Sequence, residues 1–389
     1  MVIKKEDSKM YEKHDSFFAL KHKKNEKIKN ILDRIIKTSK DVSIIKNLST
    51  EYQQLLKTVI QDLTSDTDLN SKTQFNLKSN VISEIKTVED KDLPRYLVHR
   101  YRYEIFPQIK KIDNFPPYLQ IEPTSICNYR CVFCFETDPT FTNKKNGHMG
   151  QMTLDLFKNV IDQAEGNIEF ISLASRGEPL VCPDITKMLE YTSKKFLNLK
   201  LNTNASLLDE RKCHAILSGG VKTIVFSADA ATEPLYSKLR VNGNLSKVIK
   251  NVENFKRIKE TKYPSSQVIS RVSGVKFSNS QDLKSMEKVW GDLVDQVAFV
   301  NYNPWENSYN KKPNNITDAC SDLWRRMFVW WDGKTNPCDV DYKSHLSVGS
   351  FLKNNIQELW NSEKYTQLRE EHLNKKRQNV KPCSSCTVI

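Results

Sequence analysis

Three cysteines stand close together in the stretch CNYRCVFC, which runs from Cys127 to Cys134 and includes Cys131. Thiolates bind zinc, copper(I) or iron–sulfur clusters, and a structural zinc site takes four ligands. This group has no fourth cysteine nearby. Three thiolates can instead hold three irons of a 4Fe–4S cluster and leave the fourth iron open to a non-protein ligand. By itself the spacing also allows a zinc knuckle or structural thiols.

A second group of cysteines lies near the end of the sequence. It consists of Cys320, Cys338, Cys383 and Cys386, the last two forming a CxxC pair. Four thiolates are a complete ligand set for one 4Fe–4S cluster or one zinc ion. The remaining cysteines, Cys182 and Cys213, match neither pattern, and we expect them to be ordinary buried thiols.

The elements that must position these residues follow a regular alternation. Strands are predicted over residues 118–126, 168–175, 197–205, 221–230, 267–277 and 294–302, and helices over 153–164, 185–196, 209–220, 245–260 and 280–293. Strands that alternate with helices predict a parallel sheet, closed or nearly closed into a barrel. In such folds the chemistry lies at the C-terminal ends of the strands.

Polar residues stand at those predicted strand ends. They are Gly177, Glu178 and Pro179 after the second strand, Asn202 and Asn204 in the third, Ser227 and Asp229 in the fourth, and Arg271 in the fifth. The first cysteine group follows the first strand in the same way. We therefore expect all of these residues at one end of the barrel.

The chain has a different character on either side of the barrel. Residues 1–95 lack cysteine, tryptophan and glycine, and residues 27–40 and 49–63 place apolar side chains at helical spacing. Ser49 or Thr50 is a suitable N-cap for the second helix. We predict a helical N-terminal extension over 1–95, packed on the main body or on a partner.

Two further boundaries follow from the same reading. The barrel is predicted over residues 96–303, and the regular alternation stops after it. Residues 304–389 hold the second cysteine group and are predicted to form a small C-terminal domain. The polar stretch over residues 64–80 is predicted to be a loop.

Composition restricts the compartment and the partners. The net charge of +13 would suit nucleic acid, an anionic membrane surface or an acidic substrate. The lysines are scattered among Asn and Glu, however, and no nucleic-acid-binding signature is present. No apolar run predicts a membrane span or a signal peptide. Nine cysteines in 389 residues are too few for a secreted disulfide scaffold. We expect a cytoplasmic protein that binds no nucleic acid.

The CxxxCxxC motif, with Phe133 before its last cysteine and a predicted strand ahead of it, resembles the radical S-adenosylmethionine (radical SAM) enzymes. The resemblance implies an α/β fold with a partial (β/α)6 TIM-like barrel. It also implies a 4Fe–4S cluster on Cys127, Cys131 and Cys134, whose open iron is chelated by SAM. SRGEPL resembles the GGEP element of the family, with Arg176 in place of the first glycine.

The resemblance further implies a set of SAM contacts. Gly177, Glu178 and Pro179 correspond to the element whose backbone receives the methionyl amino group, Asn202 and Asn204 to positions that bind ribose or the methionine moiety, and Ser227 and Asp229 to the end of the fourth strand. Arg240 stands where the family often has an arginine facing the SAM carboxylate, which a planar guanidinium can bind at two points. Arg271 is expected to line the adenine or the substrate.

The second cysteine group, with Gly333 ahead of Cys338, resembles the SPASM/twitch domains of radical SAM enzymes. A full SPASM domain carries seven cysteines and two auxiliary clusters. The region here has the four cysteines named above, so the resemblance implies the shorter twitch form with one auxiliary 4Fe–4S cluster on them. It extends over residues 118–389.

In this family, reductive cleavage of SAM gives a radical that abstracts hydrogen from a substrate, with an electron donor such as flavodoxin or ferredoxin. One fully ligated auxiliary cluster is a suitable acceptor for the remaining electron. The resemblance therefore implies oxidation or epimerisation of a small substrate: a sugar, an aminosugar or a nucleotide-linked sugar. Candidate catalytic residues are Arg271, Asp339 and Asp341, with Trp305 as a further positioning candidate and Cys182 as the hydrogen donor of an epimerase.

Two other readings remain open at this point. Radical SAM maturases of ribosomally made peptides often carry an N-terminal winged-helix domain. Residues 1–95 show helices without a strand pair for a wing, which favours a small substrate. A zinc-stabilised, non-catalytic binding module is the third reading, which the intact motifs disfavour.

Overall fold

The computed structural model describes residues 12–14, 24–65, 71–302 and 305–389. In this part of the chain one sheet has the strand order β1-β9-β8-β6-β5-β4-β2-β10-β11-β12. Its parallel centre consists of β2 (Tyr118–Ile121), β4 (Phe170–Leu173), β5 (Asn198–Thr203), β6 (Val221–Ser227), β8 (Ile269–Lys276) and β9 (Gln296–Asn301). These are the six predicted strands, and each pairs with its predecessor in the sequence, as in a barrel that is left open.

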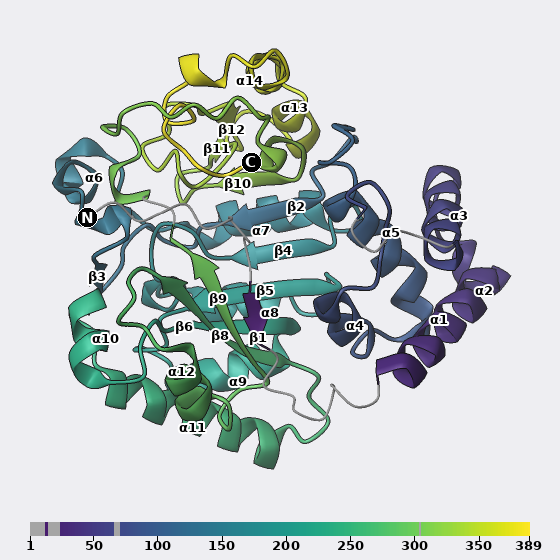
Figure 1. Ribbon diagram of the computed structural model, residues 1–389, viewed down its shortest axis with the longest axis horizontal. Coiled ribbons are helices and arrows are strands. Elements are labelled where there is room, and N and C mark those ends of the chain that lie inside the picture. Colours follow the sequence, from purple (N-terminus) through teal and green to yellow (C-terminus); the bar gives the residue numbers. More distant parts are fainter. Residues whose placement is uncertain (1–11, 15–23, 66–70, 303–304) are drawn as a thin grey trace.

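The predicted helices cover the outside of these strands (Figure 1). They are α7 (Leu154–Ala164), α8 (Ile185–Tyr191), α9 (Glu210–Ser218), α11 (Leu245–Lys262) and α12 (Leu283–Trp290). In α7 the buried side chains Phe157, Val160, Ile161 and Ala164 recur at helical spacing on one face. Thr153 begins that helix by accepting the backbone N–H of Leu156.

The C-terminal part continues the barrel sheet. β10 (Arg326–Val329) pairs in parallel with β2, with Arg326 opposite Tyr118 and Val329 opposite Ile121. β11 (Lys334–Asn336) and β12 (Gly349–Ser350) follow in antiparallel order. Helices α13 (Ile356–Trp360) and α14 (Glu363–Leu373) lie beyond them (Figure 1). The second cysteine group is therefore built directly onto the first barrel strand.

The N-terminal helices pack on the barrel, as expected. They are α1 (Lys24–Lys40), α2 (Val42–Ile45), α3 (Thr50–Thr64), α4 (Ser79–Ile85) and α5 (Leu93–Glu104). Ser49 caps α3, and their apolar core includes Phe170 and Leu197 of the barrel. The predicted boundary at residue 95 falls inside α5. In Figure 1, α4 and α5 lie beside the N-terminal ends of the barrel strands.

Short elements complete the chain. They are β1 (Glu12–His14), β3 (Arg130–Cys131), β7 (Arg240–Val241), α6 (Pro139–Thr142) and α10 (Glu233–Leu239). β1 pairs antiparallel with β9, so the N-terminal region also contributes a strand. Residues 71–78 of the predicted loop contain no helix or strand, and residues 66–70 lie outside the described residues. None of the described helices combines the length and the apolar character needed to span a membrane.

Candidate active site

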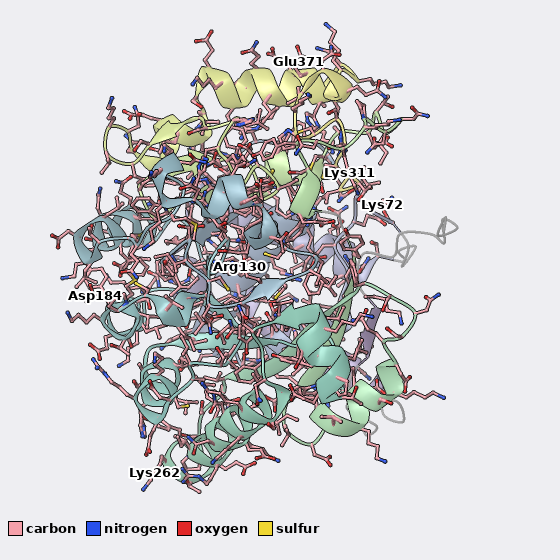
Figure 2. All side chains as sticks on the ribbon, turned by 90° about the vertical axis from the view of Figure 1, so that its left-hand side faces the viewer. Lys72, Arg130, Asp184, Lys262, Lys311 and Glu371 are labelled. Carbon is pink, nitrogen blue, oxygen red and sulfur yellow. The ribbon has the colours of Figure 1, made fainter. Side chains whose placement is uncertain are left out.

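The first cysteine group lies at the C-terminal end of β2. Figure 2 views the molecule from this end, with Arg130 of the cysteine loop near the centre. β3 pairs antiparallel with β7, which places Cys131 opposite Arg240. The N–H of Val132 also donates to the carbonyl of Leu239 at 3.0 Å. The loop is thus fixed to a segment more than a hundred residues away in the sequence.

The three thiols of this loop suit a thiolate-bound cluster. Burial raises the pKa of Cys127, Cys131 and Cys134, and for Cys134 the two neighbouring thiols raise it further. None of them forms a disulfide. Across the described residues, no three Cys, His, Asp or Glu side chains are gathered tightly enough for one metal ion. A four-iron cluster is wider than a single ion, so its thiolate ligands stand further apart. Three thiols that interact electrostatically but do not converge on one point therefore fit a cluster of this kind.

Gly177 and Glu178 connect the end of β4 to the cysteine loop. The N–H of Glu178 donates to the carbonyl of Ile126 at 3.0 Å. A Cβ on Gly177 would lie 2.4 Å from the carbonyl oxygen of Thr124 and 2.7 Å from the nitrogen of Ile126, so only glycine fits there. Pro179 begins a short 3-10 helix directly afterwards.

The carboxylate of Glu178 also holds the end of β5. It accepts the hydroxyl of Thr203 at 2.6 Å, the N–H of Asn204 at 2.6 Å and the N–H of Leu180 at 3.0 Å. The side-chain amide of Asn204 in turn donates to Asn128 of the cysteine loop at 3.0 Å. Glu178 and Asn204 therefore position the loop and the neighbouring strand end, and their predicted contacts with SAM stay predictions.

Two buried polar atoms at these strand ends have no hydrogen-bond partner among the described residues. They are Oδ1 of Asn202 in β5 and Oγ of Ser175 after β4. Orphaned buried polar atoms are rare, and they call for a partner such as a ligand. Their position beside the cysteine loop fits a polar cofactor such as SAM. Ser227, at the end of β6, is half-buried opposite Ser273 of β8.

Asp229 and Arg240 form a buried ion pair with 2.5 Å between Oδ2 and Nε. Asp229 also accepts the N–H of Val275, and Nη1 of Arg240 lies 3.8 Å from the sulfur of Cys131. The arginine expected to face the SAM carboxylate is thus held against the cysteine loop by Asp229. Its positive charge beside Cys131 opposes the rise in the pKa of that thiol.

The second cysteine group is assembled from three segments of the C-terminal part. Cys320 precedes a short helix, Cys338 follows β11, and Cys383 and Cys386 lie near the end of the chain. Burial raises the pKa of Cys320 to about 12, and the charge of Cys386 raises it as well. Arg377 donates to the carbonyls of Cys383 at 3.1 Å and Cys386 at 2.7 Å. These thiols too are within electrostatic reach of one another, and their chemistry fits an iron–sulfur cluster.

A cavity of about 800 Å³ links this second group to the barrel interior. Its wall includes all four C-terminal cysteines, together with Lys200, Thr223 and Arg271 of the central strands. Its floor is formed by Glu84, Arg100 and Glu104 of α4 and α5. Helices α4 and α5 therefore close the bottom of the cavity, a role that their sequence did not indicate.

The candidate catalytic residues divide into two groups. Arg271, Asp339 and Trp305 line the cavity. Burial raises the pKa of Asp339, which accepts a hydrogen bond from the Gln120 side chain, to about 6. Asp341, by contrast, accepts the hydroxyl of Tyr309 at 2.7 Å and the N–H groups of two following residues, so its carboxylate organises its own loop.

The position expected for Arg271 is wrong. The sequence places this residue at the C-terminal end of the fifth strand, but β8 runs from Ile269 to Lys276 and Arg271 is near its beginning. The strand extends further because all of its residues from Arg271 to Lys276 pair with β9. Arg271 is therefore in the lower part of the barrel, where its Nε donates to Gln296 at 2.8 Å.

Sequence reasoning also missed two residues. Lys200 lies within β5 and lines the cavity, and Arg176 forms buried contacts with β2 and with the C-terminal part. A lysine inside a predicted strand is a weak signal, because it can face either side of the sheet. Arg176 was visible only as a departure from the GGEP pattern. Cys182 is 2% exposed within the apolar core, as expected for a structural thiol.

Comparison with known proteins assigns both parts of this site. Residues 121–286 match the radical SAM superfamily, and residues 320–387 match the SPASM iron–sulfur cluster-binding domain. The tungsten-containing aldehyde ferredoxin oxidoreductase cofactor-modifying protein of Pyrococcus furiosus is 23% identical over 304 residues, 65% of this chain and 83% of that protein. GTP 3',8-cyclase of Clostridium botulinum is 28% identical, but the match covers 35% of this chain and less than half, 42%, of the cyclase.

Among solved structures, SuiB of Streptococcus suis bound to the precursor peptide SuiA has a similar fold. The TM-score is 0.54 at 17% identity, and the match covers 89% of this chain and 82% of SuiB. This likeness shows the fold alone, and the two domain matches show that the chain combines a radical SAM domain with a SPASM domain. It is a radical SAM enzyme with a C-terminal SPASM-type auxiliary domain, and these domains imply SAM, a 4Fe–4S cluster and an auxiliary iron–sulfur cluster.

Proposed function

We propose that this protein is a radical SAM oxidoreductase that oxidises a small, sugar-type substrate. The proposal rests on one cavity. Its wall is formed by residues of the central barrel strands together with all four C-terminal cysteines. A substrate in this cavity would lie beside the auxiliary site. We assign the SAM-binding cluster to Cys127, Cys131 and Cys134, and the auxiliary cluster to the four cysteines of the cavity.

Oxidation of an alcohol to a ketone removes a hydrogen atom, a proton and an electron from the substrate. When bound, SAM and the two clusters supply the acceptors of the hydrogen atom and of the electron. The protein itself must hold the substrate, exclude water and accept the proton. The floor formed by α4 and α5 supports water exclusion, and Asp339 is the side chain of the cavity suited to accept a proton.

The cavity favours a small polar molecule. About 800 Å³, part of it beside the cysteines, falls within the range of roughly 300–1,000 Å³ typical of small-molecule sites. Gln120, Ser172, Lys200 and Thr223 form a polar layer across neighbouring strands of the barrel. Two of the matched relatives are likewise named for small molecules, a cofactor and GTP.

Oxidation is favoured over epimerisation by the place of Cys182. An epimerase needs a hydrogen donor that reaches the substrate radical. The thiol of Cys182 is the candidate that the sequence offers for this role. It lies in the apolar core, packed in the same cluster as Leu180 and Ile185. Oxidation is therefore the main proposal and epimerisation an outcome of the test.

The test is reconstitution without oxygen, followed by reduction and addition of SAM with a panel of deuterated sugars and aminosugars. Mass spectrometry of the 5'-deoxyadenosine formed is the readout. We expect deuterium in that product from one sugar, and the mass change of the sugar then separates a ketone from an epimer. Cleavage of SAM without deuterium transfer from any sugar would overturn the substrate class and move peptides to first place.

A further inference from the structure

Lys200 is a charged side chain inside the barrel with no counter-charge in contact. It lies in the middle of β5, between Ser172 of β4 and Thr223 of β6 in the register of the sheet. Its side chain lines the cavity. Within the described part of the chain, the ammonium group makes no hydrogen bond and no ion pair. Lys200 is half-buried and faces the cavity, so its ammonium group is available to an anion that enters there.

The neighbours of Lys200 increase the positive potential. Desolvation lowers the pKa of Lys200 to about 7, and the guanidinium groups of Arg271 on β8 and Arg326 on β10 act in the same direction. Glu84 on α4 is the nearest opposing charge, but its carboxylate accepts the hydroxyl of Tyr96 at 2.7 Å and the amide of Asn198 at 3.2 Å. The same oxygen, Oε2 of Glu84, also lies 3.4 Å from Nη1 of Arg100, so this carboxylate is paired with another cation rather than with Lys200.

The remaining acidic groups of the cavity have other partners, and one of them, Asp339, accepts a hydrogen bond from Gln120 and interacts with Arg326. Seven lysines and arginines line it against four aspartates and glutamates. On the floor, Glu104 binds Lys78 at 2.8 Å and Arg100 at 2.8 Å. Asp322 lies 3.8 Å from Arg325 and 3.7 Å from Arg326. None of these acidic groups forms an ion pair with Lys200 in the described part of the chain.

A second donor stands next to Lys200. Thr223 is its register neighbour on β6 and lines the same cavity, and among the described residues its hydroxyl has no hydrogen-bond partner. An ammonium and a hydroxyl side by side, near a guanidinium, match the oxygen atoms of a phosphate or a carboxylate. The aligned register of β5, β6 and β8 holds these donors in place.

We propose that Lys200, together with Thr223 and Arg271, binds an anionic group of the substrate, a phosphate or a carboxylate, in the barrel interior. The inference rests on the proposed function, because it assumes that the substrate occupies this cavity. The substrate is then an anionic sugar: a phosphorylated or nucleotide-linked sugar, or a sugar acid. The anion would lie below the reacting carbon and orient it toward the strand ends.

Anion binding can be measured without turnover. The cluster-loaded protein is titrated calorimetrically with pyrophosphate, glucuronate or glucose, in the presence of SAM and without a reductant. Wild type is compared with Lys200→Met, Lys200→Arg and Thr223→Val. Lys222→Met is the matched control, because Lys222 precedes Thr223 on β6 and does not line the cavity.

We expect one of the two anions to bind to wild type more tightly than glucose, and Lys200→Met to weaken it by about tenfold or more. Lys200→Arg should restore most of the affinity, Thr223→Val should weaken it less, and Lys222→Met should leave it unchanged. The anion that depends on Lys200 identifies the group as phosphate or carboxylate. Iron content equal to that of wild type shows that each variant has folded.

Three results would overturn the subsite: neither anion binds to wild type, Lys200→Met binds as tightly as wild type, or glucose binds as tightly as the anions. These results are separate from failure of the proposed function. Efficient deuterium transfer from a neutral sugar would keep the oxidoreductase and reject the subsite. Lys200-dependent anion binding without deuterium transfer from any sugar would keep the subsite and reject sugar oxidation.

Discussion

Arg176 and Glu122 form a buried two-point ion pair at the ends of β4 and β2. Nε of Arg176 lies 2.7 Å from Oε2 of Glu122, and Nη2 lies 2.6 Å from Oε1. The two side chains are 2% and 0% exposed. Nη1 donates to the carbonyl of Tyr342 at 2.8 Å, and the N–H of Trp331 donates to Glu122 at 3.3 Å. The pair therefore joins the barrel to the auxiliary domain.

Replacement of Arg176 by Ala should strongly destabilise the protein. It leaves the Glu122 carboxylate buried without its counter-charge, and removing one partner of a buried pair costs about 3–5 kcal/mol. Urea unfolding of the cluster-loaded protein measures the loss. The matched control is Lys187→Ala, which removes an exposed ion pair with Asp184 and should cost about 1 kcal/mol or less. Equal unfolding free energies for the two variants would contradict the role assigned to Arg176.

Iron content should report the two cysteine groups separately. Two four-iron clusters give about eight irons per chain. Cys131→Ala and Cys338→Ala should each lower the iron and sulfide content to about half, because each removes a ligand from a different group. Cys213→Ala is the control, since Cys213 is a buried thiol of the apolar core. Zinc in place of iron, or loss of iron from the control, would contradict the assignment.

Gly177→Ala should impair SAM binding. The new Cβ would overlap backbone atoms of Thr124 and Ile126, which lead directly into Cys127, so the cysteine loop must shift. We expect a loss of SAM affinity of about tenfold or more in equilibrium dialysis. Gly147→Ala is the control: its Cβ meets nothing within 4 Å, and only its φ of +73° adds strain, about 1–2 kcal/mol. A Gly177→Ala protein with wild-type SAM affinity would refute this account.

Anion affinity should depend on pH. The pKa of Lys200 is lowered to about 7, so the free ammonium loses its proton, and with it the attraction, as the pH rises through this value. The charged groups that act on it are Arg271 on β8, Arg326 on β10 and Glu84 on α4. We expect tighter binding at pH 6 than at pH 8.5 in wild type. In Lys200→Arg the charge persists, so the fall in affinity between pH 6 and pH 8.5 should be absent; a parallel fall would argue against Lys200.

The same shift should make stability rise with pH. An unfolded lysine has a pKa of about 10.4, so between pH 7 and pH 10 the unfolded chain binds more protons at this position than the folded protein. The destabilisation from the buried ammonium is complete below pH 7 and disappears toward pH 10. Lys200→Met should therefore be more stable than wild type at pH 6.5 and lose that advantage by pH 10. A difference in unfolding free energy that stays constant with pH would contradict the lowered pKa.

Local patterns predicted much of this protein. The alternation of strands and helices identified all six central strands, because apolar periodicity and caps act over a few residues. Both cysteine groups were evident from the sequence. The cysteines of the first group follow one strand within a single loop, and the second group ends in a CxxC pair. Gly177 and Glu178 were found in the same way, as a short motif at a strand end.

Only the tertiary structure decided how the cavity is built. β10 extends the sheet beside β2, α4 and α5 close the floor, and Arg176 reaches Tyr342 across the domains. These contacts join segments far apart in the sequence, and no local pattern specifies them. Strand register decided that Lys200 faces the barrel interior, because a shift of one residue would have turned its side chain to the other face of the sheet. The sequence by itself thus determined the helices, the strands and the two cysteine groups. Packing and strand register determined which polar side chains face one another.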